Sequence, residues 1–435
     1  MKGLRIRYRG ALHALSEADR AALVDRTAVA VDEMVRTTSE AIIDVVRRDG
    51  DAALISLARE YDRVRLRSLE VPREAWQDAL RQLDPGLRAA MERAAANIRT
   101  VHAASIPKSV EVSPEPGVVV GRRPDPLRRA GVYAPGGRAA YPSSVLMGAI
   151  PARVAGVEEV IICAPPTSNG VPEAATLAAA ELAGADRVFA VGGAGAIAAM
   201  AFGTASIPRV DRIVGPGNAY VAQAKLLVAN VVGIDSPAGP SELLIVADDT
   251  ADPMRMAGEL LAQAEHDPDA VVVLVAVGET LGTKVTEALE KLLPVQERRS
   301  IIERALAKRG ALLSVGSTDE AIAFANAFAA EHLLLATADA EALLANVRSA
   351  GTVFVGESSS VTFGDYITGA NHVLPTSGTA RSYSGLSTGD FIRWTTYQRI
   401  DRDAAARLSR DVAVFADAEH LPAHAAAARA WRTLA

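Results

Sequence analysis

Hydrophobic and polar positions follow two different periods along the chain. In the first 110 residues apolar side chains recur at helical spacing, which predicts one helix from Ser39, as its N-cap, to Arg48 and another over Asp84–Val101. Residues 114–128 form a connector rich in proline and arginine. Beyond Gly131, short β-branched runs alternate with alanine-rich helical segments. This alternation is typical of a parallel sheet whose two faces are covered by helices.

The alternation falls into two consecutive series. The first series predicts strands at 157–163, 187–191 and 212–214, with helices at 172–182, 196–202 and 219–231. The second series predicts strands at 242–247, 270–277, 311–315 and 333–337, with helices at 253–266, 282–292, 300–308 and 318–329. Two such series predict an α/β fold with two Rossmann-like domains. The polar segment from about Arg393 predicts a helical tail that docks on its own body or on a partner subunit.

Composition and charge exclude several classes of protein. The chain has 435 residues, of which 49% are hydrophobic and 23% are charged, as in soluble globular proteins. Its net charge of −6 argues against the basic face that binding to nucleic acid or to an anionic membrane requires. We therefore expect neither nucleic acid nor a membrane among its partners.

The cysteine count and the longest apolar stretch predict the compartment. The single cysteine, Cys163, excludes an internal disulfide framework and suits a reducing environment. The uncharged stretch 188–208 is interrupted by glycines, which predicts strand, turn and helix instead of a membrane span. The N-terminus lacks the apolar core of a signal peptide. We expect a soluble cytoplasmic protein.

Carboxylate, imidazole and amide groups gather in four short segments. On the predicted helix 253–266, the face opposite the apolar one carries Arg255, Glu259, Gln263 and His266, and this helix taken alone favours a solvated polar face over a binding site. The other three segments each place an acid near a histidine: Glu331 with His332, Asp365 with His372, and Glu419 with His420 and His424. A surface turn is the alternative at 331–332. Together these groups suit Zn²⁺ or Mn²⁺, although no spacing rule applies to segments so far apart.

Glycine-rich turns follow several predicted strands. From Gly193 the sequence has the pattern G-x-G-x-x-A at the start of a helix, where backbone amides can face a pyrophosphate. The acidic residue expected at the end of the next strand is missing, because Asp211 falls before that strand. Similar turns occur at 135–137 and 215–218. A nucleotide-binding cleft and ordinary turn chemistry both explain these turns.

Taken together, these segments resemble the histidinol dehydrogenase family. The run 234–242, Ile-Asp-Ser-Pro-Ala-Gly-Pro-Ser-Glu, continuing to the Gln-Ala-Glu-His at 263–266, is similar to the signature block of that family. Further matching blocks follow the family's order and approximate spacing, at 132–137, 141–144, 215–218, 330–332 and 364–376. The resemblance covers about residue 25 to the C-terminus. Blocks of this length are specific for the family and less specific for one substrate.

The resemblance implies an NAD-dependent zinc enzyme that oxidises L-histidinol to L-histidine. The reaction passes through an aldehyde in two hydride transfers and ends histidine biosynthesis. By the resemblance, Glu331 and His332 are the catalytic acid–base pair, and the ligands of one zinc ion per subunit are Gln263, His266, Asp365 and His424. The same four ligands contact substrate, together with Ser241, His332, His372 and Glu419. NAD is contacted by Tyr133 and Asn218 and at position 195.

The resemblance also implies the assembly and the domain boundaries. The family is a homodimer, with the C-terminal segment of one subunit completing the site of the other, so we expect two intertwined subunits. The expected divisions are a helical N-terminal segment (1–26), a discontinuous first α/β domain with most zinc and acid–base residues (27–130 and 243–386), a second Rossmann-like domain on the NAD side (131–242), and a C-terminal helical tail (387–435). In this division Glu419 and His424 act in the partner's site.

One departure from the family keeps alternatives open. Where the family usually has a glutamine that contacts NAD, this chain has Gly195. A related zinc- and NAD-dependent dehydrogenase of another small alcohol, for example a sulfonated diol, is therefore an alternative. A non-catalytic nucleotide- or metal-binding protein would have degraded acid–base positions, whereas Glu331, His332 and Asp365 are all present. A zinc hydrolase is disfavoured, because the chain has no His-Glu-x-x-His segment.

Overall fold

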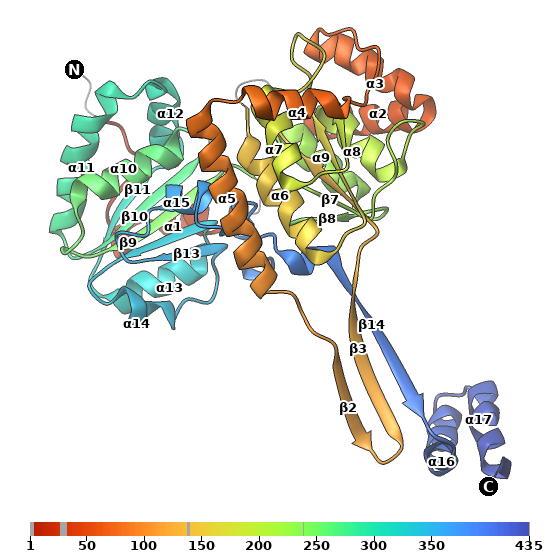
Figure 1. Ribbon diagram of the computed structural model, residues 1–435. Helices are drawn as coiled ribbons and strands as arrows, with labels where there is room; N and C mark the ends of the chain where they lie inside the picture. Colours follow the sequence, from red (N-terminus) through yellow and green to blue (C-terminus); the bar gives the residue numbers. More distant parts are fainter. Residues whose placement is uncertain (1–3, 27–32, 137–139, 238, 435) are drawn as a thin grey trace. The chain divides into compact units, whose positions relative to one another are not determined.

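The computed structural model describes residues 4–26, 33–136, 140–237 and 239–434 (Figure 1). The chain divides into two compact units, one made of Met1–Ser105 with Arg128–Phe391 and the other of Ile106–Leu127 with Ile392–Ala435. The first unit contains two parallel sheets with their helices, and the second contains a small antiparallel sheet and a helical pair. The chain is an α/β protein with two parallel sheets, as the alternating pattern predicts.

The larger sheet has six parallel strands in the order β1-β11-β10-β9-β12-β13. Their bounds are β1 (Tyr8–Ala11), β9 (Glu242–Ala247), β10 (Val271–Val277), β11 (Ala311–Val315), β12 (His332–Ala336) and β13 (Thr352–Val355). One face is covered by α10 (Pro253–Ala264), α11 (Thr280–Leu292) and α12 (Arg299–Arg309). The other is covered by α13 (Thr318–Phe328), with α1 (Glu17–Val24) and α14 (Ala340–Leu344) beside it.

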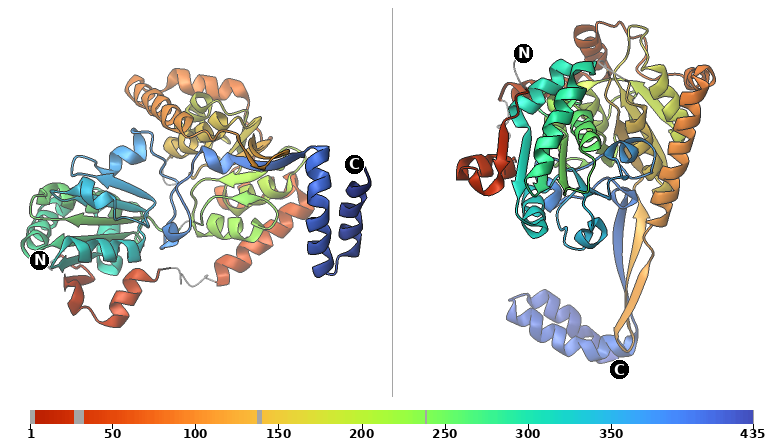
Figure 2. Two further views of the ribbon diagram at one scale, coloured as in Figure 1. Left: turned by 90° about the horizontal axis from the view of Figure 1, so that it is seen from below. Right: turned by 90° about the vertical axis from the view of Figure 1, so that its left-hand side faces the viewer.

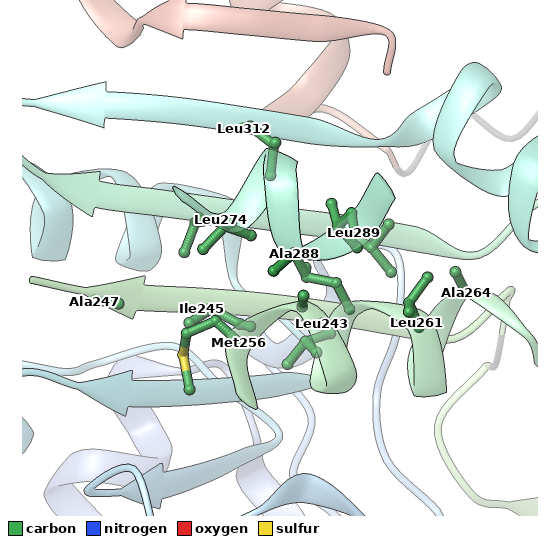
Figure 3. Packing of buried hydrophobic residues seen from close by; sticks show 14 of the residues in the cluster. Leu243, Ile245, Ala247, Met256, Leu261, Ala264, Leu274, Ala288, Leu289 and Leu312 are labelled. Carbon is green, nitrogen blue, oxygen red and sulfur yellow. The ribbon is translucent and has the colours of Figure 1, made fainter. Parts of the chain in front are cut away.

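Alternation of side chains along the central strands explains why both faces are covered. Leu243, Ile245 and Leu274 point to one side and pack under α10 and α11, as Figure 3 shows. Leu244 and Val246, which lie between them in sequence, point to the opposite side and contact the cluster that includes α13. Every residue of β9 is buried, and all of them after Glu242 are apolar, which is the pattern of a doubly covered parallel sheet.

The second sheet has five parallel strands in the order β6-β5-β4-β7-β8. Their bounds are β4 (Arg129–Tyr133), β5 (Glu159–Ala164), β6 (Arg187–Ala190), β7 (Arg212–Val214) and β8 (Gly233–Ile234). The intervening helices are α6 (Pro142–Ala155), α7 (Ala174–Ala183), α8 (Gly193–Phe202) and α9 (Ala219–Val228). The predicted strands and helices of both series are present, with ends that agree to within three residues.

The helices between residues 33 and 104 pack on helices of the five-stranded sheet. They are α2 (Glu33–Asp49), α3 (Asp51–Leu57), α4 (Arg73–Gln82) and α5 (Pro85–Ala104). Helix α2 contacts α8 and α9, α4 contacts α7, and α5 contacts α6. The predicted division placed residues 27–130 with the other sheet, so the structure groups this segment differently. The prediction of Ser39 as an N-cap is wrong, because Ser39 is buried in the middle of α2.

The N-terminal segment is also not purely helical. Residues 8–11 form β1, an edge strand of the six-stranded sheet that pairs with β11, and only then does helix α1 (Glu17–Val24) follow. Ser16 caps α1 by accepting a hydrogen bond from the N–H of Asp19 at 3.1 Å. The segment expected at 1–26 therefore contributes a strand to the core of the first unit.

The second unit contains three antiparallel strands where the sequence predicted a connector and a helical tail. They are β2 (Val110–Glu115), β3 (Val118–Pro126) and β14 (Ile392–Ile400), in the order β14-β3-β2 (Figure 2). Pro124 and Pro126 argued against a strand at this position, because proline has no N–H to donate to a sheet. Both lie beyond the end of the pairing of β3 with β2 and pair only with β14. The helices α16 (Arg402–Ala418) and α17 (Pro422–Arg429) follow and pack through Ala413, Ala416 and Ala425.

The structure bears on two features noted in the sequence, the single cysteine and the long uncharged stretch. Cys163 is buried in β5, and burial raises the pKa of its thiol, so this cysteine behaves as core filler. Among the described residues, no helix combines the length and the apolar character that crossing a lipid bilayer demands.

Candidate active site

The predicted acid–base residues lie at the amino-terminal edge of the six-stranded sheet. Helix α13 ends at Phe328, and Ala329 adopts a left-handed conformation, with φ of 52°, that turns the chain toward β12. Glu331 precedes this strand and His332 is its first residue, and they are only 5% and 3% exposed. The alternative of a surface turn at 331–332 is therefore excluded.

The backbone of a single residue, Glu242 at the start of β9, holds both side chains. Its N–H donates to Oε2 of Glu331 at 2.7 Å, and its carbonyl oxygen accepts from Nδ1 of His332 at 3.0 Å. Because Nδ1 keeps its proton in this arrangement, Nε2 of His332 is the nitrogen that gains and loses a proton. Nε2 has no hydrogen-bond partner in the described part of the chain and lies 3.4 Å from Oδ1 of Asp365. It is placed to take a proton from a molecule bound beside Asp365.

Burial and charge shift the pKa values of this pair. Burial raises the pKa of the Glu331 carboxyl, and His332 offsets only part of that shift. Burial also lowers the pKa of His332, but the carboxylates of Glu331 and Asp365 together outweigh burial and hold this pKa well above its ordinary value. Nδ1 of His332 lies 3.4 Å from Oε2 of Glu331. An imidazole and a carboxyl this close, in a site with little water, suit acid–base catalysis.

Three of the predicted metal ligands line one small hollow. Gln263 lies in the last turn of α10, His266 follows that helix, and Asp365 lies in α15 (Val361–Tyr366). Gln263 is buried, and its Nε2 atom has no hydrogen-bond partner within the described ranges. The helix face that holds Gln263 is therefore not simply a solvated face. Glu259, one turn earlier on the same face, also lines the hollow.

Glu259 ties the two helices of this hollow together. Its Oε2 atom accepts a hydrogen bond from the N–H of Val361 at 3.2 Å, at the start of α15. Burial raises the pKa of this carboxyl. The contact fixes α15 to α10, and with it the position of Asp365. The helical spacing in the sequence placed Glu259 on this face without giving it a role.

The remaining substrate residues fall into two groups. Ser241 immediately precedes Glu242, and Nδ1 of His372 donates to the carbonyl oxygen of Asp365 at 2.9 Å, so both are adjacent to the acid–base pair or the hollow. Glu419 and His424, by contrast, belong to the second compact unit and are exposed. Within the described residues, no three His, Cys, Asp or Glu side chains come together to hold a metal ion. The first unit alone brings together three of the four predicted ligands, one of them an amide.

The predicted NAD residues lie at the carboxyl ends of strands in the five-stranded sheet. The strand order reverses between β4 and β7, which is where ligands bind in open α/β sheets. Tyr133 ends β4, and its hydroxyl oxygen accepts from the N–H of Gly193, the first residue of α8, at 3.1 Å. Gly193 has a φ of +61° and nothing lies within 4 Å of where a Cβ would be. Open space therefore borders a helix N-terminus at this point, which suits a phosphate group.

Two further turns complete this edge of the sheet. Gly215, after β7, has a φ of +116°, and a Cβ there would lie 2.1 Å from the carbonyl oxygen of Tyr133. Only glycine allows this close approach of β7 to β4. Asn218 caps α9, since its Oδ1 accepts from the N–H groups of Tyr220 and Val221. Asn218 is exposed, and no hydrogen bond of its side-chain nitrogen occurs among the described residues, so this nitrogen can contact a ligand.

Position 195 lies beneath α3. A Cβ at Gly195 would lie 3.2 Å from a methyl group of Leu57 and 3.3 Å from one of Leu54. A longer side chain at this position would therefore displace these leucines. In this chain α3 therefore packs against position 195 closely enough to favour glycine there.

Asp62, near Tyr133, is a partly buried acid outside the set of predicted site residues. Burial raises its pKa from 3.8 to about 6, so the folded chain binds this proton more tightly than the unfolded chain does. The associated stability is present below pH 3.8 and is lost as the pH rises through about 6. Raising the pKa of this carboxyl from 3.8 to about 6 corresponds to about 3 kcal/mol, and the partial exposure of Asp62 reduces this to about 1 kcal/mol.

We therefore expect Asp62→Asn to stabilise the chain by about 1 kcal/mol at pH 8 and to have no such effect near pH 4. The midpoint of thermal unfolding, followed by circular dichroism across this pH range, measures the difference. Asp44→Asn, at an exposed acid on α2, is the matched control. A stabilisation by Asp62→Asn that does not change with pH would contradict the prediction.

A further surface hollow lies at the amino-terminal edge of the five-stranded sheet. Arg129, Arg209 and Asp211 are among its lining residues. Its arginines are already engaged, because Arg129 binds Glu159 at 2.5 Å and Arg209 donates to a backbone carbonyl. It contains none of the predicted site residues and is not a candidate active site.

Known proteins resemble this chain over nearly its whole length. The family model described as histidinol dehydrogenase matches residues 25–432. A histidinol dehydrogenase of Natronomonas pharaonis is 50% identical over 412 residues, which cover 94% of this chain and 96% of that protein. One of Methanosarcina barkeri is 45% identical over 416 residues, covering 95% of each. The crystal structure of histidinol dehydrogenase from Elizabethkingia anophelis superposes with a TM-score of 0.92 at 34% identity and covers 98% of each chain. The chain therefore belongs to the histidinol dehydrogenase family.

Proposed function

We propose that this chain oxidises L-histidinol to L-histidine, through the aldehyde, with NAD as hydride acceptor and one zinc ion per subunit. The observation that carries the proposal is the buried pair Glu331–His332. Nε2 of His332 faces Asp365, which lines the same hollow as Gln263. An oxidant that takes up hydride requires a base for the hydroxyl proton, and Nε2 supplies one. We place the enzyme in the cytoplasm, because its single cysteine cannot form an internal disulfide and suits a reducing compartment.

The residues of the hollow are chemically suited to zinc. His266 offers an imidazole nitrogen, Asp365 a carboxylate oxygen and Gln263 an amide oxygen, and the buried amide of Gln263 lacks a partner for its nitrogen in the described part of the chain. These three residues would hold the ion. When bound, zinc supplies an electrophilic anchor for the imidazole and amine of histidinol, and NAD accepts the hydride. The open space beside Gly193 suits the pyrophosphate of NAD.

The chain's own residues account for both half-reactions. In the first, Nε2 of His332 takes the hydroxyl proton of the substrate as the hydride leaves the carbinol carbon. In the second, Glu331 takes a proton from water as the water oxygen adds to the aldehyde, and the protonated His332 returns its proton to the aldehyde oxygen, which gives the hydrate. His332 then takes a hydroxyl proton of the hydrate as the second hydride leaves its carbon. The burial of Glu331 and His332 excludes bulk water from these proton transfers. The two roles need adjacent groups, which the sequence Glu331-His332 supplies.

NADH formation from L-histidinol tests the function. Purified, zinc-loaded protein with excess NAD is expected to form two NADH per histidinol at completion, and a chelator is expected to abolish the reaction. No turnover with histidinol, but activity with another small alcohol, would support the alternative of a related dehydrogenase. Gly195, which departs from the family pattern, favours that alternative and would be the first position to vary.

The two half-reactions separate in a Glu331→Gln variant. Glutamine is nearly the same size and keeps an oxygen that can accept from the N–H of Glu242, but it cannot take a proton from water. We expect oxidation of histidinol to the aldehyde to continue within threefold of the wild-type rate, while oxidation of the aldehyde falls by about 10²–10⁴-fold. Rapid-mixing measurements with each substrate distinguish the steps. A variant fully active from aldehyde to acid would remove this role from Glu331.

We infer a homodimer in which the second compact unit supplies the fourth zinc ligand to the partner's site. His424 and Glu419 are exposed, and so are large apolar side chains nearby, with Phe415 72% and Val414 63% exposed. Exposed apolar surface of this kind favours burial against a second chain. The incomplete set of three ligands in the first unit then gains His424 from the other subunit.

A mixing experiment distinguishes a ligand supplied by the partner from one supplied by the same chain. His424→Ala alone is expected to lose zinc and activity, and His332→Asn alone to lose activity. When the two inactive variants are dissociated and reassembled together, mixed dimers contain one intact site, so about a quarter of the wild-type activity returns. No recovery, in mixed dimers verified by differential tags, would show that His424 acts within its own chain.

A further inference from the structure

A buried ion pair lies directly behind the acid–base residues. Arg26, two residues beyond α1, binds Glu242 through two hydrogen bonds, Nε to Oε1 at 2.7 Å and Nη2 to Oε2 at 2.9 Å. Only 3% and 1% of the two side chains are exposed. Arg26 also donates to the carbonyl oxygens of Leu23 and Phe328, and its guanidinium lies 3.5 Å from the centre of the Phe328 ring. The arginine is therefore held from three sides.

Glu242 connects this ion pair to the site. Its side chain accepts a third hydrogen bond, from the N–H of Ser377 at 2.9 Å. Its backbone N–H and carbonyl oxygen bind Glu331 and His332, as described above. One residue therefore holds both acid–base side chains through its backbone, while its own side chain is fixed by Arg26 and by the loop at 377.

Stability alone does not account for such a pair. Removing two charges from water costs several kcal/mol each, and replacing a buried ion pair by apolar residues is often neutral or stabilising. Orientation does account for it, because a displacement of about 1 Å in a reacting group can lower a rate 100-fold. A bidentate arginine fixes the direction of a carboxylate as well as its position, which a lysine cannot do.

We propose that Arg26 and Glu242 form a positioning pair that sets the orientation of Glu331 and His332 for proton transfer. Neither side chain touches the reacting groups, so both act through the backbone of β9. The inference deepens the proposed function and rests on it. It assigns to the N-terminal segment a part in the reaction, and it requires that both half-reactions depend on the pair.

The test compares Arg26→Lys with wild type and with Arg187→Lys. Arg187 makes an equivalent bidentate pair with Glu70, at 2.8 and 2.6 Å, on the five-stranded sheet. With zinc content and thermal midpoint measured in parallel, Arg26→Lys is expected to lower kcat for both histidinol and the aldehyde by about 10-fold or more, with KM changed less than threefold. Arg187→Lys is expected to leave kcat unchanged. This parallel loss differs from that of Glu331→Gln, which affects only the second step.

A second variant distinguishes loss of positioning from loss of the folded state. The double variant Arg26→Gln with Glu242→Gln leaves no buried charge unpaired, so it is expected to fold and still to lose kcat for both steps. Wild-type kcat in either folded variant would overturn the inference while the proposed function stands. Absence of NADH formation by the wild-type enzyme would instead contradict the proposed function, and the inference with it.

Discussion

An enzyme with asparagine at position 332 is expected to oxidise neither histidinol nor the aldehyde at a useful rate. Asparagine can keep the hydrogen bond that Nδ1 of His332 donates to the carbonyl oxygen of Glu242, because its side-chain NH₂ lies in a similar place. It has no group that takes up a proton near neutral pH. Loss of a general base lowers rates by about 10²–10⁴-fold, and here the loss falls on both half-reactions.

NADH formation from each substrate, with zinc content as a check on the fold, measures this effect. His13→Asn, which changes an exposed histidine near the N-terminus, is the matched control and is expected to retain full activity. A His332→Asn enzyme with more than about a tenth of the wild-type rate would assign the proton transfer to another group.

The largest effect on stability is expected from a second buried ion pair, Lys225 with Asp235. Both side chains are almost fully buried, and both form hydrogen bonds with the backbone of Gly215. The N–H of Gly215 donates to Oδ2 of Asp235 at 2.7 Å, and Nζ of Lys225 donates to the carbonyl oxygen of Gly215 at 3.1 Å. Asp235→Ala leaves the ammonium of Lys225 buried and unpaired, which destabilises a protein by about 3–5 kcal/mol.

Denaturation of Asp235→Ala by urea measures the loss, and Lys225→Met in the same chain is expected to restore part of it because no charge is then left unpaired. Glu40→Ala, in the exposed pair with Arg36, is the control and is expected to change stability by less than about 1 kcal/mol. Because Gly215 lies at the proposed NAD cleft, the double variant is also expected to raise KM for NAD more than it lowers kcat. An Asp235→Ala chain as stable as the control would contradict the account of this pair.

Helices and strands of both parallel sheets were predictable because their patterns are local. The strand Glu242–Ala247 and the strand Ala311–Val315 have the predicted bounds, since short, mainly apolar runs flanked by turns suffice to define them. The strand β14 (Ile392–Ile400) was not predictable in this way. Its alternating polar residues form a strand only because β3 pairs with it from more than 260 residues away.

In the candidate site, too, some residues were predictable from the sequence and others were not. Glu331, His332, Gln263 and Asp365 were identified from their types and from the family resemblance, whereas Arg26 gave no signal in the sequence. An arginine near an N-terminus is ordinarily solvated, and only the fold buries this one against Glu242. Likewise, nothing local indicated that Lys225 and Asp235 meet around Gly215.

The sequence by itself determined the α/β class, the order of most elements, the family and the residue types of the site. These properties depend on periodicity and on runs of neighbouring residues, which a linear sequence carries directly. Only the tertiary structure decided that α2–α5 pack on the helices of the five-stranded sheet, that Nε2 of His332 is the nitrogen that exchanges a proton, and that Glu242 holds the acid–base pair. These properties depend on contacts between residues far apart in sequence, whose geometry is set by how the whole unit buries its apolar surface.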